Sequence, residues 1–151
     1  MTEKASFSRY GKSFQEGLIQ LIYEDRPFAD QITEVLDINF LELEYLRVFV
    51  GKIISYRDRY GTHPSAEAII TILRADLDNE DEVVRKQVRE YFARITKKEI
   101  TDREYIKEIS LDFCRKQNLK EAMLKSVGLL QTCSFDEISS VINDSLKLGS
   151  D

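Results

Sequence analysis

Apolar residues recur every three to four positions along most of the chain, the spacing that places side chains on one face of an α-helix. The first such stripe predicts a helix over about 10–24. Its inward face consists of Tyr10, Phe14, Leu18, Leu21 and Ile22. Proline suits the first turn of a helix, so Pro27 favours a second helix over about 26–36. Because no period-two run of β-branched residues interrupts the pattern, we expect an all-α fold.

The segment over about 40–60 is apolar around most of its circumference, which is typical of a helix covered on several sides. Its apolar residues are Leu43, Leu46, Phe49, Val50, Ile53, Ile54, Tyr56 and Tyr60. We therefore place this helix at the centre of the fold. Its two tyrosines are of a type that stacks on nucleic-acid bases, but their position assigns them to the core. Gly61 is predicted to end the helix as a left-handed cap, and the pair Pro64–Ser65 to begin the next one.

Two further stripes predict a fourth and a fifth helix, separated by a polar connection over 78–81. The fourth stripe consists of Ile69, Ile70, Leu73 and Leu77, and the fifth of Val84, Val88, Tyr91, Phe92 and Ile95. Residues 1–98 are therefore predicted to form a globular helical head, a bundle of about five helices.

Residues 99–149 are predicted to form a helical hairpin that protrudes from this head. Thr101 and Glu104 stand three residues apart, as in a capping box, and no proline follows before Ser134. We therefore expect one long helix over about 102–133. A second pair with capping-box spacing begins a short helix over about 134–148.

The long helix carries apolar residues on two faces, whereas the short helix carries a single stripe. The first face consists of Ile106, Ile109, Phe113, Met123, Leu124 and Val127, and the second of Leu111, Ala122, Leu129 and Cys133. At roughly 25 cal/mol per Å² of apolar surface, leaving the surplus in water costs several kcal/mol. The surplus packs either against the head or between chains, most simply across a two-fold axis. We favour pairing between chains, with contacts from Leu111, Phe113, Ala122, Leu129 and Cys133.

The overall charge argues against binding to duplex DNA. Lys and Arg number 22 against 27 Asp and Glu, a formal net charge of −5, whereas proteins that bind through DNA phosphates are normally basic. Basic residues nevertheless gather on the long helix at Arg115, Lys116 and Lys120. Such residues are typical of a solvated helix face, and the functional interpretation is a contact with single-stranded DNA or an acidic partner.

Residue patterns typical of catalysis are incomplete in this sequence. Gly11-Lys12-Ser13 matches the end of a phosphate-binding loop, but Ser6 stands where that loop needs a glycine. His63, the single histidine, is predicted to lie in an exposed turn without a metal-ligand partner at helical spacing. The two cysteines are interpreted as small buried side chains of a reducing compartment. We therefore expect no catalytic, cofactor or metal site in this chain.

The chain also has no feature that directs a protein to a membrane. No apolar run approaches the roughly 18 residues that cross a bilayer, and Met1-Thr2-Glu3-Lys4 opens no secretory signal. We expect a soluble cytoplasmic protein without a membrane partner.

Several segments of the head occur in a recognisable order. They are Tyr10-Gly11-Lys12-Ser13-Phe14-Gln15, Asp25-Arg26-Pro27-Phe28-Ala29, Phe40-Leu41-Glu42-Leu43-Glu44-Tyr45-Leu46, and Tyr56 to Tyr60 followed by His63-Pro64-Ser65. Together they resemble the start of the DnaB-like replicative DNA helicases of phages and prophages, and the likeness spans about residues 8–148. These are mainly core and cap residues, so their joint order carries the resemblance.

The resemblance implies that the chain is the N-terminal collar of a hexameric helicase that acts in DNA replication in the bacterial host cytoplasm. The implied partners are further copies of the chain, primase and a helicase loader, with DNA bound through the motor. In the family, ATP and Mg²⁺ belong to a C-terminal RecA-like ATPase domain that is absent from this chain, so no catalytic residue carries over. The alternative interpretations are a stand-alone helical adaptor or helicase-loader-like protein and, third, a helical DNA-binding regulator.

Overall fold

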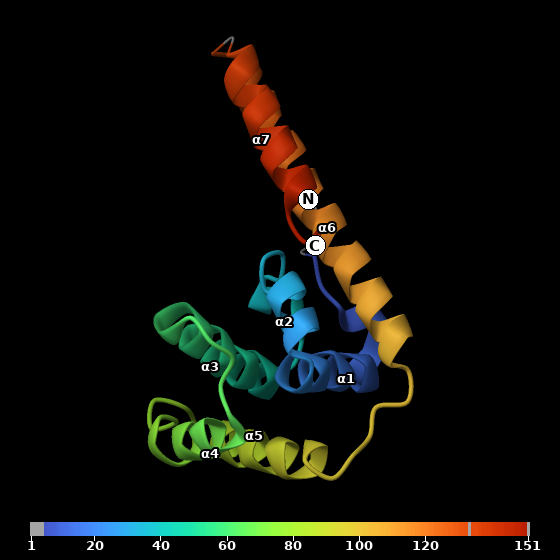
Figure 1. Ribbon diagram of the computed structural model, residues 1–151. Helices are drawn as coiled ribbons and strands as arrows, with labels where there is room; N and C mark the ends of the chain where they lie inside the picture. The colour runs from blue at the N-terminus through green and yellow to red at the C-terminus, as the bar shows by residue number, and fades with distance from the viewer. Residues whose placement is uncertain (1–4, 133, 151) are drawn as a thin grey trace.

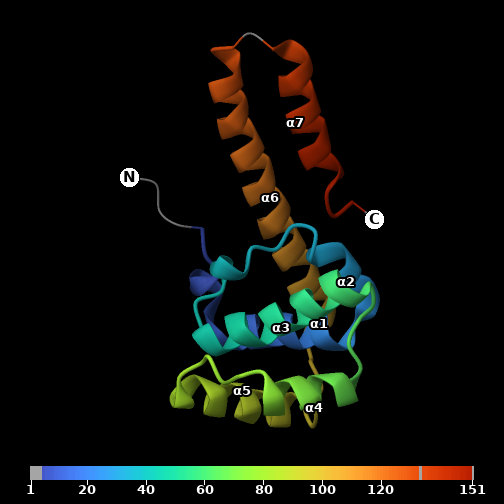
Figure 2. The ribbon, with the colours of Figure 1, turned by 90° about the vertical axis from the view of Figure 1, so that its left-hand side faces the viewer.

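The computed structural model describes residues 5–132 and 134–150, and this part of the chain is all-α, as predicted. The elements are η1 (Ser8–Tyr10), α1 (Gly11–Glu24), α2 (Arg26–Ile32), η2 (Ile38–Phe40), α3 (Glu44–Tyr60), α4 (Ala66–Ala75), α5 (Glu82–Ile95), α6 (Arg103–Leu130) and α7 (Phe135–Lys147). Figure 1 shows α4 and α5 at the base, α1 and α3 above them, and α6 rising from the head. Figure 2 shows α6 and α7 side by side as they extend away from the head.

The core of the head forms around α1 and α3. The fully buried apolar side chains of these two helices are Leu18, Ile19, Leu21, Ile22, Leu46, Phe49, Val50 and Ile53. From α5, Val88 and Tyr91 complete the same core. Because α1 contacts α2, α3 and α6, it shares with α3 the central position that the apolar pattern assigned to residues 40–60.

Three residues that their spacing assigned to the core lie outside it. Tyr60 is 58% exposed and Ile70 is 39% exposed, and Tyr56 is half-buried. Tyr56 and Tyr60 line a groove between α3 and α4, so no packed helix covers the last turns of α3 on that side. The core assignment of these residues is therefore wrong, because periodicity identifies an apolar face without showing whether a neighbouring helix reaches it.

Two helix ends differ from prediction where local side-chain hydrogen bonds compete with the helix. The second helix ends at Ile32, because Thr33 takes the C-cap and its hydroxyl donates to a carbonyl one turn back (2.7 Å). The third begins at Glu44, because the Asp37 carboxylate accepts from the Asn39 N–H (2.9 Å) and starts η2 instead.

The N-cap predicted for the second hairpin helix is confirmed, whereas the one predicted for the first is wrong. Asp102 occupies the N-cap of α6 without a side-chain cap bond, so the capping box expected from Thr101 and Glu104 is not formed. At α7, by contrast, Ser134 Oγ accepts from the Glu137 N–H (3.3 Å), as its spacing predicts. Both hairpin helices end slightly earlier than predicted.

Buried polar side chains hold the connection between α5 and α6. Gln20 is 2% exposed, and its Nε2 donates to the carbonyls of Lys98 (2.7 Å) and Ile95 (3.3 Å). The Tyr91 hydroxyl donates to the carbonyl of Glu16 (2.6 Å). Since unpaired buried polar groups are costly, these bonds fix where the chain leaves α5 and hence the direction in which α6 rises.

The turn between α3 and α4 is set by its two caps. Gly61 ends α3 with φ +69°, the left-handed conformation that glycine adopts without steric cost. Ser65 begins α4, and its Oγ accepts from the Ala68 N–H (3.1 Å). Both caps confirm the prediction from sequence.

His63 lies half-buried in this turn rather than in the exposed position that we predicted. Its Nε2 is 2.7 Å from the carbonyl oxygen of Tyr23, and its Nδ1 is 2.8 Å from Nη1 of Arg57. A carbonyl only accepts and a guanidinium only donates, so the neutral ring must carry its proton on Nε2. The imidazole thereby ties the turn to the ends of α1 and α3.

We expect the protein to lose stability as the pH falls below about 6.5, the ordinary pKa of histidine. Burial, together with Arg57 and Arg26, lowers the pKa of His63 in the folded state against the opposing effects of the Tyr23 carbonyl and Asp30. The unfolded chain therefore binds more protons in this range, and acid favours unfolding. Urea midpoints measured on both sides of this pH check the direction.

The matched variant for this prediction is His63→Gln. The glutamine amide offers an N–H donor group and a carbonyl acceptor but does not titrate, so the part of the acid sensitivity that comes from His63 should disappear. If the urea midpoint of His63→Gln falls with pH as steeply as that of the parent chain, His63 is not the group responsible.

Candidate functional site

The first half of α6 is packed against the head. Ile106 is 7% exposed and Cys114 is fully buried. The ring centroid of Phe113 lies 4.6 Å from that of Phe7 and 5.3 Å from that of Phe40. These contacts make the base of α6 part of the core of the head.

Polar contacts also anchor this half of α6. Lys107 Nζ lies 2.6 Å from the Asp25 carboxylate, and Asn118 Nδ2 donates to the carbonyl of Val35 (2.9 Å). Burial acts to raise the pKa of Asp25, but the hydrogen bonds from Lys107 and from the Phe28 N–H outweigh it, so the pKa is lowered. Asp25 thus caps α2 while it binds α6, and the hairpin is held firmly at its base.

Above the head, α6 is covered by α7 along one line. Ala122 and Ser126 are both 8% exposed, and Ser126 Oγ donates to the Ala122 carbonyl (2.8 Å). The half-buried side chains of α7 along the same seam are Ile138, Val141 and Ile142. Beyond α7, the Gly149 N–H donates to the Glu34 carboxylate (2.9 Å), which attaches the far end of the short helix to the segment after α2.

Large apolar side chains remain exposed on the outer half of this hairpin. Those of α6 are Met123 (53%), Leu124 (62%), Val127 (61%) and Leu130 (57%), and those of α7 are Phe135 (81%) and Leu146 (51%). We call these six residues the hairpin patch. Single exposed apolar residues are ordinary, whereas a group of this kind on adjacent helices marks an interaction surface.

Helical geometry places most of this patch on one side of the hairpin. At about 100° per residue, Met123 and Leu130 stand roughly a right angle from the seam line through Ala122. Phe135 and Leu146 stand at a similar angle, in the same rotational sense, from the inward stripe of α7. Each angle is taken while looking along its own helix from the N-terminus. Because α6 and α7 run antiparallel and face each other, the same rotation on each helix turns these side chains toward the same side of the hairpin. The two flanks therefore form one surface.

The structure places the predicted interface residues in different surroundings. Phe113 and Leu111 pack against the core of the head, and Ala122 is covered along the seam with α7. Leu129 is half-buried, and Cys133 lies outside the described residues. Within one chain, Ala122 is thus buried, whereas Leu111, Phe113 and Leu129 each keep part of their surface exposed.

Three of the exposed patch residues of α6, Met123, Leu124 and Val127, belong to the stripe that includes Ile106, Ile109 and Phe113 in the sequence pattern, whereas Leu130 belongs to neither predicted face. The head covers the first half of this stripe and leaves Met123, Leu124 and Val127 uncovered. The spacing identified the apolar face of the long helix, but it did not indicate at which residue the head stops covering that face. Phe135, directly after the N-cap of α7, was not predicted at all.

The three predicted basic residues do not form one group. Lys116 and Lys120 are exposed and line a groove between α6 and the start of the described chain, together with Arg9. Arg115 lies elsewhere, with its aliphatic carbons near Gly149. Lys116 pairs with Asp112 (2.9 Å) at the exposed surface.

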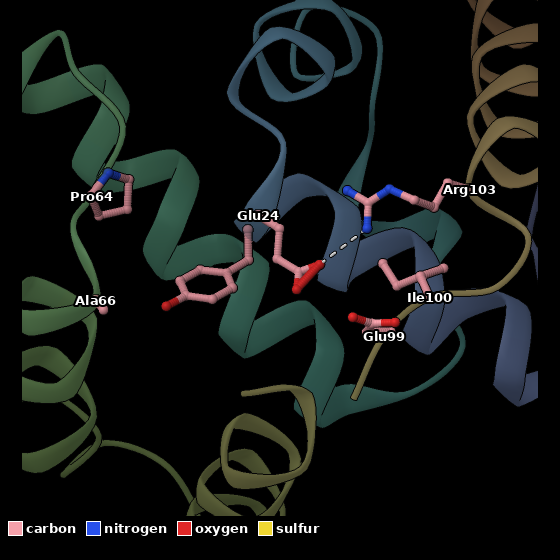
Figure 3. Close-up of a pocket in the computed structure, with 7 residues that line it drawn as sticks. Glu24, Pro64, Ala66, Glu99, Ile100 and Arg103 are labelled. Carbon is pink, nitrogen blue, oxygen red and sulfur yellow. Dashed lines mark ion pairs between the residues drawn. The ribbon is translucent and has the colours of Figure 1, made fainter. Parts of the chain in front are cut away.

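A separate open pocket lies where the end of α1 meets the turn before α4 and the connection into α6 (Figure 3). Its lining residues are Tyr23, Glu24, Pro64, Ala66, Glu99, Ile100 and Arg103. Figure 3 shows the ion pair between Glu24 and Arg103, whose charged atoms are 3.6 Å apart. The pair sits at the junction of head and hairpin, and we assign it a structural role.

Cys114, the cysteine in the described part of the chain, is held in an unreactive setting. Burial raises the pKa of the Cys114 thiol to about 12, so it stays protonated at neutral pH. Among residues 5–132 and 134–150, no three His, Cys, Asp or Glu side chains stand close enough to share a metal ion. No helix in these ranges has the length and apolar character needed to cross a bilayer.

Comparison of the chain with protein-family models, with curated proteins and with solved structures gave no match.

Proposed function

We propose that the chain is an assembly module that self-associates through the hairpin patch, and that it serves as the N-terminal collar of a DnaB-like replicative helicase. The observation that carries the first part is the set of six large apolar side chains, each more than half exposed, on the outer hairpin. The resemblance in residues 8–148 supports the second part.

The energetics favour a second copy of the chain as the partner of this patch. Covering a large apolar side chain that is half exposed contributes about 1 kcal/mol, and a two-fold contact covers two such patches at once. The hairpin is anchored at its base and at Gly149, so pairing requires little additional ordering.

The resemblance extends the proposal beyond self-association. In the family the collar belongs to a hexameric helicase and recruits primase, while ATP and Mg²⁺ are bound by the RecA-like motor domain. The proposed partners of this chain are accordingly further copies of itself, primase and a helicase loader in the bacterial cytoplasm. The proposed function of this chain is binding to these partners, and no residue of the chain is assigned a catalytic role.

We expect multi-angle light scattering to report a mass above that of the 17.6 kDa chain, rising with concentration through the micromolar range. Apolar patches that bury each other explain this rise, because association follows mass action. A mass that stays at 17.6 kDa at high micromolar concentration contradicts the assembly role. Titration calorimetry with primase from the same replication system distinguishes the two interpretations. A helicase collar should give a heat of binding, whereas a stand-alone adaptor should give none.

A further inference from the structure

A groove on the head lies between α3 and α4, at the opposite end of the molecule from the hairpin patch (Figure 1). Its volume is about 870 Å³, larger than the 670 Å³ of the pocket in Figure 3. The proposed assembly role does not use this groove, and the packing of the head leaves it open.

Each wall of the groove is one face of a helix. The lining residues recur every four positions along α3, as Lys52, Tyr56 and Tyr60, and every three to four positions along α4, as Ala68, Thr71 and Ala75. Each wall therefore extends over about two turns, roughly 10 Å along the helix axis. The side chains of the α4 wall are small, so the main chain of a third helix can approach closely there.

Apolar surface remains uncovered inside the groove. The Tyr60 side chain is 58% exposed, although its ring contacts that of Tyr56 (centroids 4.7 Å apart) and lies 5.5 Å from the Arg59 guanidinium. Tyr56 and Ile72, which also line the groove, are half-buried. The two rings are thus held in place by each other and keep apolar surface for a partner.

The charges of the groove are separated between its two walls. The cations Lys52 and Arg59 belong to α3. The carboxylates Glu67, Asp76 and Asp78 belong to α4 or to the segment directly after it. None of these five side chains forms an ion pair with another residue of the ranges 5–132 and 134–150. Both walls can therefore pair with a partner, and they require charges of opposite sign.

The charge pattern disfavours nucleic acid as the occupant of the groove. The phosphates of a strand would face three carboxylates against two cations. A partner that carries both signs of charge, one on each side of an apolar stripe, matches the two walls.

The walls also favour a helical partner over an extended one. In the interior of α3 and α4 the main-chain groups are bonded within each helix, and the described ranges contain no strand whose edge could pair with a peptide. A segment in the groove must therefore satisfy its own main chain, as a helix does. Amphipathic helices bind such grooves through apolar residues at the same three-to-four spacing.

We propose that the groove between α3 and α4 binds one amphipathic α-helix of a partner protein. The apolar stripe of that helix packs on Tyr60 and on the small side chains of the α4 wall. Carboxylates along one flank pair with Lys52 and Arg59, and basic residues along the other flank pair with the carboxylates of the α4 wall. The binding site lies on the head, so it is available whether or not the hairpin patch pairs two chains.

The test is fluorescence anisotropy of a labelled designed helix of about 18 residues, a length at which a helix is stable enough to bind as one. The probe carries a leucine stripe with glutamates along one flank and lysines along the other. Two control peptides keep the stripe and carry only glutamates or only lysines on both flanks. We expect the mixed peptide to bind about tenfold more tightly than either control, because each control places like charges on one wall. Salt at about 0.15 M screens charges beyond roughly 8 Å, so the comparison reports the groove rather than the net charge of the chain.

Reversing the charge of the α3 wall should change which peptide is preferred. The variant K52E/R59E makes both walls acidic, so the all-lysine peptide should become the tightest binder. The matched control K86E/K97E reverses two exposed lysines outside the groove and should keep the preference for the mixed peptide.

A second pair of variants tests the apolar contact. Tyr60→Ala removes the exposed ring of the groove and should weaken binding of the mixed peptide several-fold. Tyr105→Ala on α6 is the matched control, because Tyr105 is also 58% exposed and also contacts another aromatic ring. It should bind the peptide as the parent chain does. Circular dichroism should show an unchanged helical content in all four variants.

Several results overturn the proposal. Equal binding of the three peptides does so, and so does an effect of either matched control as large as that of its groove variant. Tighter binding of a proline-rich peptide rejects a helix as the occupant. A lower light-scattering mass for K52E/R59E assigns the groove to a second copy of the chain. Loss of peptide binding in Val127→Asp shows that the leucine stripe binds the hairpin patch instead.

Discussion

Val127→Asp is expected to convert a self-associating chain into a monomer. Val127 is 61% exposed within one chain and is one of the six residues of the hairpin patch. If the patch packs against a second copy, the substitution places a carboxylate in an apolar contact without a partner, at a cost of about 3 kcal/mol or more, roughly a hundredfold in affinity. Light scattering at several concentrations measures the effect, and circular dichroism should show an unchanged helical content.

The chain offers a matched control for this experiment. Val83 on α5 is 67% exposed and lies on the head, away from the hairpin. Val83→Asp introduces the same charge at an equally exposed valine, and it should leave the assembly as it is. The self-association surface is assigned wrongly if the two variants behave alike, whether both dissociate or both remain associated.

Phe113→Ala is expected to destabilise the fold by about 3 kcal/mol, because it removes a ring from the aromatic cluster that joins α6 to the head. The ring of Phe113 packs on those of Phe7 and Phe40, and a small side chain leaves a cavity there. Urea unfolding followed by circular dichroism measures the loss. Self-association of the folded fraction should change little, in contrast to the interface role that the sequence pattern predicts for Phe113.

Phe135→Ala is the natural counterpart to this variant. Phe135 is 81% exposed at the start of α7, so truncating it should leave the urea midpoint nearly unchanged while weakening association. The two variants should thus behave in opposite ways. Phe113→Ala should lose stability and keep its self-association, whereas Phe135→Ala should keep its stability and associate more weakly. A large stability loss in Phe135→Ala, or dissociation of Phe113→Ala below its unfolding transition, would reverse the two assignments.

Most of the helices were predictable because their signals lie within a few residues of each other. Gly61 stops α3 and Ser65 starts α4 through contacts that reach no further than one turn. Where the prediction failed, the reason also lies within a few residues: Asp37 caps η2 ahead of α3, and Asp102 takes the N-cap position of α6 without a side-chain cap bond. Local patterns therefore locate helices well and place their ends less accurately.

The candidate sites were only partly predictable. The apolar surplus of the long helix was visible in its spacing, but the spacing did not show that Leu111 and Phe113 pack partly against the head or that α7 buries Ala122. Arg115, Lys116 and Lys120 were identified as one basic group, whereas the structure separates Arg115 from it and adds Arg9, which was not identified. More than one hundred residues separate Arg9 from Lys116 in the chain, and only packing of η1 beside α6 brings them to one groove.

The sequence by itself determined that this protein is all-α, that α6 is long, and that α6 carries more apolar surface than α7 alone can cover. Tertiary structure alone decided that Phe113 packs against the head and that Val127 stays exposed. The physical reason is that hydrophobic periodicity records which side chains share a face of a helix. Which part of the chain packs against that face depends on contacts between residues far apart in the sequence, and no local pattern encodes them.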